Sequence, residues 1–250
     1  MVNCNPAINY QITRLLDYPM PTAVLLSGGL DSAVLVADEV SRGDVQPIYI
    51  GSGLAWEPAE RAIVARLLDA PSLRGRTRPL VSLSVDMRDV YKATHWSVTG
   101  DAPAYHTPDE DVYLPGRNII LLSKAGVFCA AAGIGRVVIG TLDHNPFPDA
   151  TPGFRASIAR TLSLGLAHDL RIEAPFAASS KADVIRKGIA LGVPFEHTLS
   201  CMKPQVREVR GVREVLHCGT CSKCRERHDA FVEAGVPDPT VYESVAFTRK

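Results

Sequence analysis

The sequence predicts an α/β protein with a doubly wound, mostly parallel sheet and a small cysteine-rich subdomain near the C-terminus. Short apolar runs alternate with amphipathic stretches, which is typical of βαβ units. A glycine-rich turn at residues 27–32 joins the first run to the first amphipathic stretch. Three of the six cysteines fall within seven residues. We expect an α/β domain over residues 1–200 and a subdomain with a hairpin and a helix, packed on it, over 201–250.

The apolar runs predict strands at residues 22–26, 45–50, 80–85, 136–140 and 172–175. The amphipathic stretches predict helices at residues 31–41, 57–69, 118–132, 154–166 and 181–191. Ser180 and Asp183 are spaced as a capping box that opens the last of these helices, and Gly192 is expected to end it. Residues 92–114 contain no strand pattern and predict a long loop over a site. The near-repeat VREVRGVREV predicts a β-hairpin that turns at Arg210 and Gly211.

Composition excludes some classes of protein. With 250 residues, 46% of them hydrophobic, the chain can bury one sizeable core. The 27 basic and 27 acidic residues balance, which argues against a protein built mainly to bind nucleic acid or an anionic membrane. No apolar run approaches the roughly 18 residues of a membrane-spanning helix, and the N-terminus lacks a signal pattern. We therefore expect a cytoplasmic protein with no membrane or nucleic-acid partner.

The motif SGGLDS, residues 27–32, has the composition of an anion-binding turn. A glycine-rich turn from a strand into a helix directs backbone N–H groups and the helix dipole at an anion. The hydroxyls of Ser27 and Ser32 can add hydrogen bonds, whereas Asp31 can face a phosphate only across a cation, which implies Mg²⁺. The alternative is an ordinary tight turn in which Asp31 or Ser32 caps the helix.

SGGLDS resembles the PP-loop of the ATP pyrophosphatases, which split ATP into AMP and pyrophosphate while they adenylate a substrate. The resemblance implies a doubly wound domain and ATP as a substrate. It implies that Tyr49 and Gly51 meet adenine through their backbone and that Lys181 contacts phosphate. The alternative for Lys181 is a solvated residue in the first turn of a helix. The loop residues that would hold pyrophosphate and Mg²⁺ are Ser27, Gly28, Gly29, Leu30, Asp31 and Ser32.

The cysteine spacing is that of a metal site. Cys218, Cys221 and Cys224 form two overlapping C-x-x-C steps, and Cys201 lies 17 residues upstream. A hairpin between Cys201 and Cys218 would close a Cys₄ site, which suits structural zinc (Zn²⁺) and leaves no open position. The alternatives are an iron–sulfur centre, or His217 or His228 in place of one thiolate. The two remaining cysteines, Cys4 and Cys129, have no partner at metal spacing, and Cys129 is expected in the core.

Longer runs narrow the resemblance. HTLSCM, CGTCSKCRER, AGVPDPTVY, YLPGRNIILLS and APFAASSKADVIRKGIALGV resemble the 7-cyano-7-deazaguanine (preQ0) synthases of queuosine biosynthesis, over about residues 22–243. That family converts 7-carboxy-7-deazaguanine and ammonia into a nitrile. One ATP activates the carboxylate for amide formation, and a second activates the amide for dehydration. The resemblance implies a ligase with small-molecule substrates, acting as a homodimer.

Arg117 and Asn118, which directly follow Pro115-Gly116, are candidates for the wall of the site. Arg117 can neutralise a phosphate or carboxylate by two parallel hydrogen bonds, and it joins Asp31 and Lys181 as a candidate catalytic residue. Its alternative is a surface arginine at a helix start, where the helix dipole disfavours a cation. Asn118 is the neighbouring candidate for substrate contact.

Two segments depart from the family pattern. Where the family has H-Y-x-Q-R-H, residues 51–57 read GSGLAWE, and where it has D-x-S-G-Y-P-D-C-R, residues 143–151 read DHNPFPDAT. Both segments follow predicted strands, where open α/β sheets place ligands. Asp149 is expected either to accept two N–H bonds from a purine-like edge or to cap the helix after Pro152. Phe147 and Trp56 are expected either to stack on a flat ring or to pack.

The sequence also leaves three alternative functions to consider. The altered loops favour a paralogous amidoligase that adenylates a different carboxylate. A tRNA-thiolating enzyme would use the cysteines for sulfur or a cluster, but the charge balance gives it little support. A non-catalytic zinc-ribbon module leaves the intact SGGLDS motif unexplained.

Overall fold

The computed structural model describes residues 20–209 and 212–245. Its main sheet has five parallel strands in the order β3-β2-β1-β4-β5. From β1 the chain adds strands first on one side and then on the other, which is the doubly wound arrangement that the sequence predicts. The strands are β1 (Thr22–Leu25), β2 (Val45–Gly51), β3 (Val81–Ser84), β4 (Arg136–Val138) and β5 (Arg171–Glu173).

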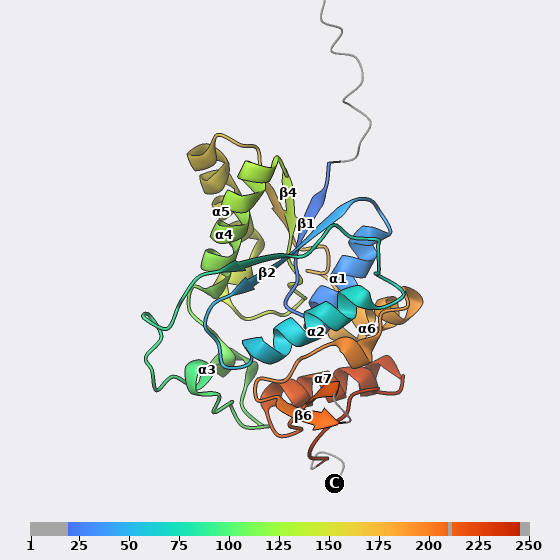
Figure 1. The fold of residues 1–250 in the computed structure, drawn as a ribbon. Helices are drawn as coiled ribbons and strands as arrows, with labels where there is room; N and C mark the ends of the chain where they lie inside the picture. Colours follow the sequence, from blue (N-terminus) through green and yellow to red (C-terminus); the bar gives the residue numbers. More distant parts are fainter. Residues whose placement is uncertain (1–19, 210–211, 246–250) are drawn as a thin grey trace, which may run out of the picture.

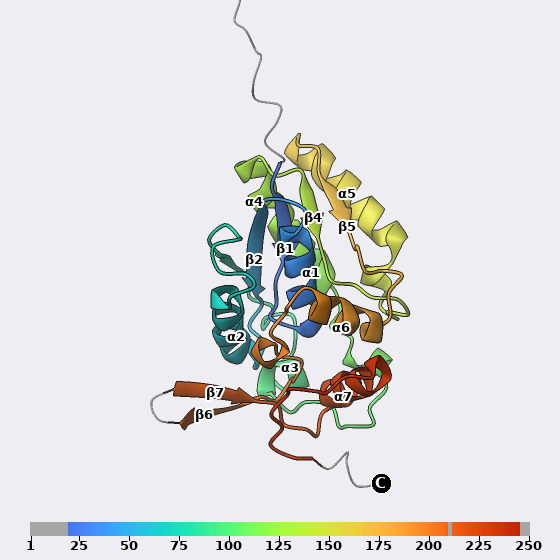
Figure 2. The ribbon, with the colours of Figure 1, turned by 90° about the vertical axis from the view of Figure 1, so that its right-hand side faces the viewer.

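Helices cover both faces of this sheet (Figures 1 and 2). On one face α1 (Leu30–Val40), α2 (Glu57–Asp69) and α6 (Lys181–Ala190) enclose a core that includes Val24, Val64 and Ile185. On the other face α4 (Arg117–Ala132) and α5 (Pro152–Leu166) enclose a core with Leu25, Ala125 and Ile158. Val24 and Leu25 point to opposite faces because side chains alternate along a strand. Cys129 is fully buried in the second core, as expected.

The C-terminal part lies at one end of the molecule (Figure 2). Strands β6 (Gln205–Val209) and β7 (Val212–Leu216) pair antiparallel, which confirms the expected hairpin, although its turn at Arg210 and Gly211 lies outside the described residues. Helix α7 (Ser222–Ala234) follows, and Phe231 packs in the core beside α1 and α6. Cys4 also lies outside the described residues.

Two features of the segments between elements differ from expectation. Residues 92–114 have no strand, as expected, but they are not a plain loop, because they form α3 (Trp96–Thr99) and the 3₁₀ helix η1 (Asp109–Val112). Ala104 also makes an isolated bridge with Cys221, so this segment reaches the cysteine region. Short 3₁₀ helices η2 (Pro148–Ala150) and η3 (Phe195–His197) lie outside that segment.

The capping predictions have mixed outcomes. The capping box of Ser180 and Asp183 is formed at the start of α6, as the sequence predicts. The expectation that Asp149 caps α5 is wrong, because the Thr151 hydroxyl accepts the N–H of Phe154 at that position. Within the described ranges, none of the helices combines the length and the apolar character that crossing a bilayer requires.

Candidate active site and metal centre

The SGGLDS loop connects β1 to α1. Gly28 has φ +81°, a conformation that favours glycine, and a side chain there would also press on Val64 of α2. Among the described residues, no side chain caps the N-terminus of α1; the Ser32 hydroxyl instead donates to the Gly29 carbonyl oxygen over 2.9 Å. The alternative of a simple turn capped by Asp31 or Ser32 is therefore wrong. An uncapped helix N-terminus after a glycine turn has the free N–H groups and the dipole that bind anions.

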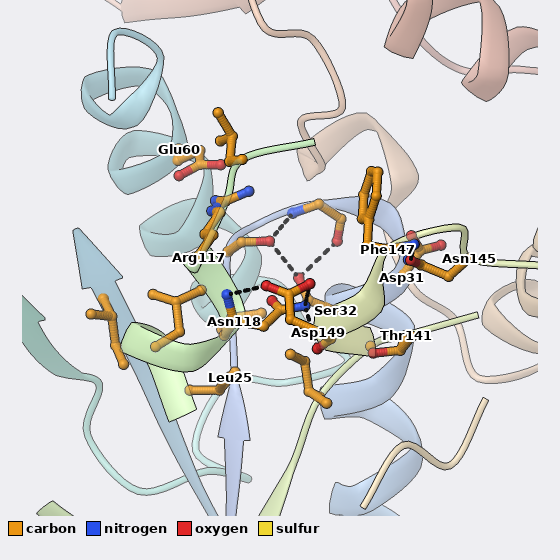
Figure 3. Close-up of a pocket in the computed structure, with 18 of the residues that line it drawn as sticks. Leu25, Asp31, Ser32, Glu60, Arg117, Asn118, Thr141, Asn145, Phe147 and Asp149 are labelled. Atoms are coloured by element: carbon orange, nitrogen blue, oxygen red, sulfur yellow. Dashed lines mark hydrogen bonds between the residues drawn. The ribbon is translucent and has the colours of Figure 1, made fainter. Parts of the chain in front are cut away.

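A cavity of about 260 Å³ opens at the carboxyl ends of β1, β2 and β4 (Figure 3). β1 and β4 are neighbours whose connections lead in opposite directions, so the cavity lies at the switch point of the sheet. Its walls come from the loop, the strand ends, the start of α4 and the segment after β4. The sequence-predicted site residues that line it are Ser27, Gly29, Asp31, Ser32, Tyr49, Arg117, Asn118, Phe147 and Asp149.

A second cavity, of about 430 Å³, adjoins the first. Both are lined by Asp31, Arg117 and Phe147, and the second extends to Leu30 and Lys181. The structure thus brings the two groups of candidate residues, those of the loop and those of α4, to one connected region. Gly28 and Gly51 line neither cavity.

At Gly51, packing against α2 requires a residue without a side chain. A side chain at this position would collide with those of Arg61 and Glu57 on α2. Its neighbour Tyr49 does reach the first cavity, and its hydroxyl donates to Glu60 Oε2 over 3.0 Å. Burial, followed by the nearby negative charge of Glu60, raises the pKa of Tyr49, so the phenol stays protonated.

A cluster of charges lies beside the loop. The Lys181 ammonium is 3.4 Å from Asp31 Oδ2 and also pairs with Glu226, which in turn accepts from Lys223 over 2.6 Å. The Lys181 side chain is 19% exposed, so the alternative of a solvated lysine is wrong. Burial alone would raise the pKa of Glu226, but Lys181 and Lys223 lower it to about 2. The cluster therefore keeps a charged lysine against the loop.

One carboxylate oxygen of Asp31 is not used by the pair with Lys181. Its Oδ1 atom is buried and, among the described residues, has no hydrogen-bond partner. Burial raises the pKa of Asp31, although Lys181 opposes that effect. A buried carboxylate oxygen without a donor next to an anion-binding turn can accept a bound cation.

Arg117 begins α4 just after Gly116, which has φ +77°. Its Nε atom is buried without a hydrogen-bond partner among the described residues, and its side chain lines both cavities. The alternative of a surface arginine is wrong. An unpaired guanidinium in a cavity is a ready partner for a carboxylate or a phosphate.

Asp149 and Asn118 are linked by hydrogen bonds. Asp149 Oδ2 accepts the backbone N–H of Asn118 over 3.1 Å, and the Asn118 amide donates to the backbone oxygen and Oδ1 of Asp149 over 3.1 and 3.3 Å. Asp149 thus caps α4, not the helix that follows it. Burial raises its pKa, although the bonds from Asn118 oppose that rise.

The aromatic candidates have ring partners. Phe147 stacks on Tyr113 with 5.0 Å between ring centroids, and both line the first cavity. Trp56 stacks on Trp96 with 5.7 Å between centroids, and both line the second. Each ring is therefore packed and at the same time faces a cavity, so the two alternatives for Phe147 and Trp56 do not exclude each other.

Glu60, on α2, is a further candidate site residue, which the sequence motifs did not predict. It is 8% exposed, lines both cavities and accepts hydrogen bonds from Tyr49 and from Trp56 Nε1, the latter over 3.1 Å. Burial, opposed by Arg117, raises its pKa to about 7. A sequence signal existed, because Glu60 is an acidic residue on the same helix stripe as the apolar Ile63, Val64 and Leu67. Glu226 and Lys223 were also missed, and their sequence around the cysteines gave no such signal.

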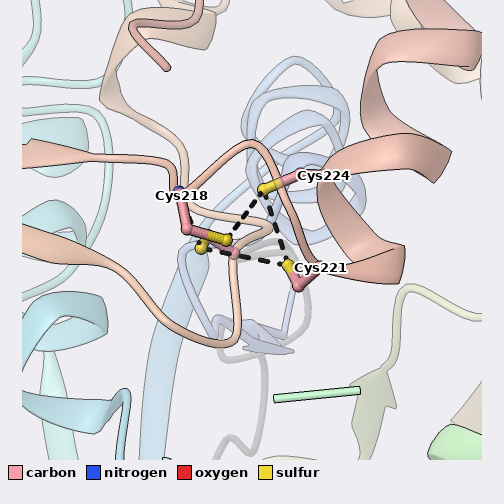
Figure 4. Close-up of side chains that lie close together, drawn as sticks. Cys218, Cys221 and Cys224 are labelled. Atoms are coloured by element: carbon pink, nitrogen blue, oxygen red, sulfur yellow. Dashed lines mark hydrogen bonds between the residues drawn. The ribbon is translucent and has the colours of Figure 1, made fainter. Parts of the chain in front are cut away.

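The four cysteines converge as the spacing predicts (Figure 4). The sulfur atoms of Cys201, Cys218, Cys221 and Cys224 all lie within 4.8 Å of one another and are buried. Backbone N–H groups of Lys203 and Cys218 point at Cys201 Sγ over 3.3 and 3.2 Å, which favours a thiolate. This set can hold a metal ion and suits the four thiolate ligands of zinc.

The histidine alternatives are not supported. The metal-binding group contains neither His217 nor His228. His217 is buried, its Nε2 accepts the N–H of Ser200 over 3.1 Å, and burial lowers its pKa to about 3. It therefore supports the loop that carries Cys201, as a neutral ring.

Comparisons with known proteins agree with this geometry. The family model described as "Queuosine biosynthesis protein QueC" matches residues 22–235. The chain is 30% identical over 231 residues to the 7-cyano-7-deazaguanine synthase of Methanoregula boonei, covering 90% of this chain and 100% of that one. It is 34% identical over 231 residues to the synthase of that name from Methanoculleus marisnigri, covering 88% and 97%.

Solved structures are more distant. A predicted subunit of tRNA methyltransferase from Methanocaldococcus jannaschii is 14% identical, with a TM-score of 0.43 over 91% of this chain and 94% of that one. The family match, by contrast, spans the sheet, the SGGLDS loop and the four cysteines. The chain belongs to the QueC family of queuosine biosynthesis proteins.

Proposed function

We propose that this chain is an ATP-dependent carbon–nitrogen ligase that converts 7-carboxy-7-deazaguanine and ammonia into 7-cyano-7-deazaguanine. Relatives that share about a third of its residues over nine-tenths of its length carry the name of this synthase. The observation that carries the proposal is that the SGGLDS loop opens into a cavity which Arg117 and Asn118 also line. A nucleotide on the loop and an acceptor at the start of α4 would therefore meet in one space.

ATP would lie along the switch point of the sheet. The uncapped N–H groups at the start of α1 and the Lys181 ammonium would bind its phosphates. Apolar side chains at the ends of β1 and β2 offer a surface for adenine, among them Leu25, Ile48 and Ile50. Asp31, with its unpartnered oxygen, would hold Mg²⁺, which neutralises charge on the phosphates when bound.

The chemistry needs positioning more than acid–base groups in its first step. An oxygen of the acceptor carboxylate attacks the α-phosphorus, and pyrophosphate leaves. Ammonia then displaces AMP to give the amide, and a second adenylation, on the amide oxygen, allows loss of AMP to give the nitrile. Arg117 would hold and neutralise the acceptor carboxylate, since its buried Nε has no other partner among the described residues. The cavity would keep the reactants aligned and away from water.

The four cysteines would bind structural zinc. A closed set of four thiolates leaves no position for a substrate, so the ion would stabilise the fold of the C-terminal part. We also propose the division into an α/β domain, residues 1–200, and a metal-binding subdomain, residues 201–250. A cytoplasmic location and a homodimer complete the proposal, the homodimer from the family resemblance alone.

A paralogous amidoligase that acts on a different carboxylate is the second candidate. The two segments that depart from the family pattern supply Trp56, Asn145 and Phe147 to the cavity walls. Substitutions in the walls of a binding cavity change which acceptor fits, whereas the nucleotide loop is unchanged.

Mass spectrometry of the purified protein tests both candidates. The protein is incubated with Mg·ATP, ammonium and 7-carboxy-7-deazaguanine. We expect the mass of the nitrile, together with AMP and pyrophosphate. The amide alone would limit the activity to the first step, and the absence of any product would move the search to other carboxylates.

A further inference from the structure

We propose that Glu60 is the base that takes a proton from ammonium inside the cavity, so that neutral ammonia can attack the adenylated carboxylate. The inference rests on the proposed function and adds a catalytic residue to it. At neutral pH ammonium far exceeds ammonia, and ammonium has no lone pair with which to attack. The site therefore needs a proton acceptor next to the acyl carbon.

The other carboxylates that line the cavities are already engaged. Asp31 pairs with Lys181 and, in the proposed function, holds Mg²⁺ through its other oxygen, and Glu226 pairs with two lysines. Asp109 lies 3.7 Å from both Lys223 and Arg225. A carboxylate held by cations is a poor base, because the cations favour its charged form.

Two further carboxylates are excluded on other grounds. Asp149 binds the backbone and side chain of Asn118 and caps α4, so accepting a proton there would weaken the helix start. Asp143 is exposed and pairs with His144 over 3.1 Å, outside the enclosed part of the site. Glu60 is the remaining cavity carboxylate, and it takes part in none of the ion pairs found among the described residues.

The surroundings of Glu60 fit proton transfer. Its hydrogen-bond partners are neutral: the Tyr49 hydroxyl from β2, and the indole N–H of Trp56 from the residue before α2. The charged groups that act on it are Arg117 from α4, across the cavity, and Glu57 from its own helix. Figure 3 shows the Glu60 and Arg117 side chains in the same part of the cavity. Burial, moderated by these groups, gives Glu60 a pKa of about 7, so it can both accept and release a proton near neutral pH.

The proposed step balances. The Glu60 carboxylate takes one proton from ammonium and becomes a neutral carboxyl group. The lone pair of ammonia forms the carbon–nitrogen bond, the bond from the acyl carbon to the AMP oxygen breaks, and AMP leaves with that electron pair. The new amide nitrogen loses its extra proton to water, and Glu60 passes its own proton to water before the next turnover.

Glu60→Gln tests the proposal. Glutamine can accept from Trp56 and donate to the Tyr49 oxygen, so the fold is kept while the base is lost. We expect kcat/KM for ammonium at neutral pH to fall about 100-fold. The remaining rate should rise with pH in proportion to free ammonia, whereas the unaltered chain should level off once Glu60 is ionised. Hydroxylamine is largely unprotonated at neutral pH, so the variant should still form the hydroxamate at close to the normal rate.

The matched control is Glu57→Gln. Glu57 lies on the same helix and is buried, but it lines neither cavity, and glutamine can still accept from Ser52. Because the charge of Glu57 helps to raise the pKa of Glu60, this control should shift the pH profile with ammonium slightly to lower pH but keep the rate on its plateau. The role of Glu60 as a base would be overturned if Glu60→Gln lost equal activity with ammonium and hydroxylamine, or lost none with ammonium. Either result would leave the proposed function standing. If the unaltered chain adenylates no 7-carboxy-7-deazaguanine, the proposed function fails, and this inference with it.

Discussion

The Lys181 ammonium lies 3.4 Å from a carboxylate oxygen of Asp31, although the two residues belong to α6 and α1. Glu226 on α7 binds the same ammonium from another side. Three helices that meet only in the folded chain thus hold one lysine against the SGGLDS loop. Because the lysine is largely buried and charged, it is placed to neutralise an anion at this loop.

Replacement of Lys181 by methionine should abolish most ATP cleavage. The variant keeps the length of the side chain but loses the charge that faces the phosphates, so we expect a fall in the rate of AMP formation of about 100- to 1000-fold. AMP is measured by chromatography. Lys187→Met is the control, because Lys187 lies on the same helix but pairs with Asp38, away from the cavities. Similar rates in the two variants would contradict a role for Lys181 at the phosphates.

Replacement of Cys224 by serine should remove the bound metal. Serine cannot supply the fourth thiolate, so we expect metal content to fall well below one zinc per chain and the thermal unfolding temperature to drop. Metal is measured by mass spectrometry and unfolding by circular dichroism. Cys129→Ser is the control, because Cys129 is buried in the core on α4, away from the cluster, and should keep the metal. Iron in place of zinc would favour the iron–sulfur alternative.

Replacement of Asp149 by alanine should weaken the start of α4. The variant removes the acceptor for the Asn118 N–H, so the free energy of unfolding should fall by about 1 kcal/mol. Urea denaturation gives the value. Asp143→Ala, in the same loop but exposed, should change it little. An Asp149→Ala protein with unchanged stability would show that the cap is not needed.

The raised pKa of Glu60 should make the free energy of unfolding depend on pH. Burial raises its pKa from 4.5 to about 7 in the folded chain, so the folded state favours the neutral form. Its favourable contribution is complete below pH 4.5 and is lost as pH rises through 7. The two pKa values correspond to about 3 kcal/mol, an upper bound. Glu60→Gln stays neutral, so it should match the unaltered protein near pH 4 and exceed its stability at pH 8.

Urea denaturation at the two pH values measures this difference. Glu57→Gln serves as the control for a buried glutamate on the same helix. A Glu60→Gln protein whose stability differs from the unaltered chain by the same amount at both pH values would contradict the raised pKa. The measurement needs no substrate, so it stands apart from the test of catalysis.

Local patterns in the sequence determined much of the fold. The helix over Glu57–Asp69 has the predicted bounds, and the capping box of Ser180 and Asp183 is formed, because period and spacing express interactions between near neighbours. The SGGLDS turn and the two C-x-x-C steps were predicted for the same reason: a glycine conformation and a C-x-x-C step are set within a few residues, and the predicted hairpin then brought Cys201 to the other three cysteines.

The tertiary structure decided which side chains share the site. Asp149 caps α4 instead of α5, and Glu60 faces Arg117 across a cavity, because helices that are remote in sequence pack at one end of the sheet. No local pattern records such contacts, since they depend on how the elements dock. The sequence by itself determined the alternation of elements, the anion-binding turn and the metal cluster. Only docking of the helices on the sheet decided the partner of Lys181, the burial of Glu60 and the shape of the cavity, because burial and charge pairing arise from packing between distant segments.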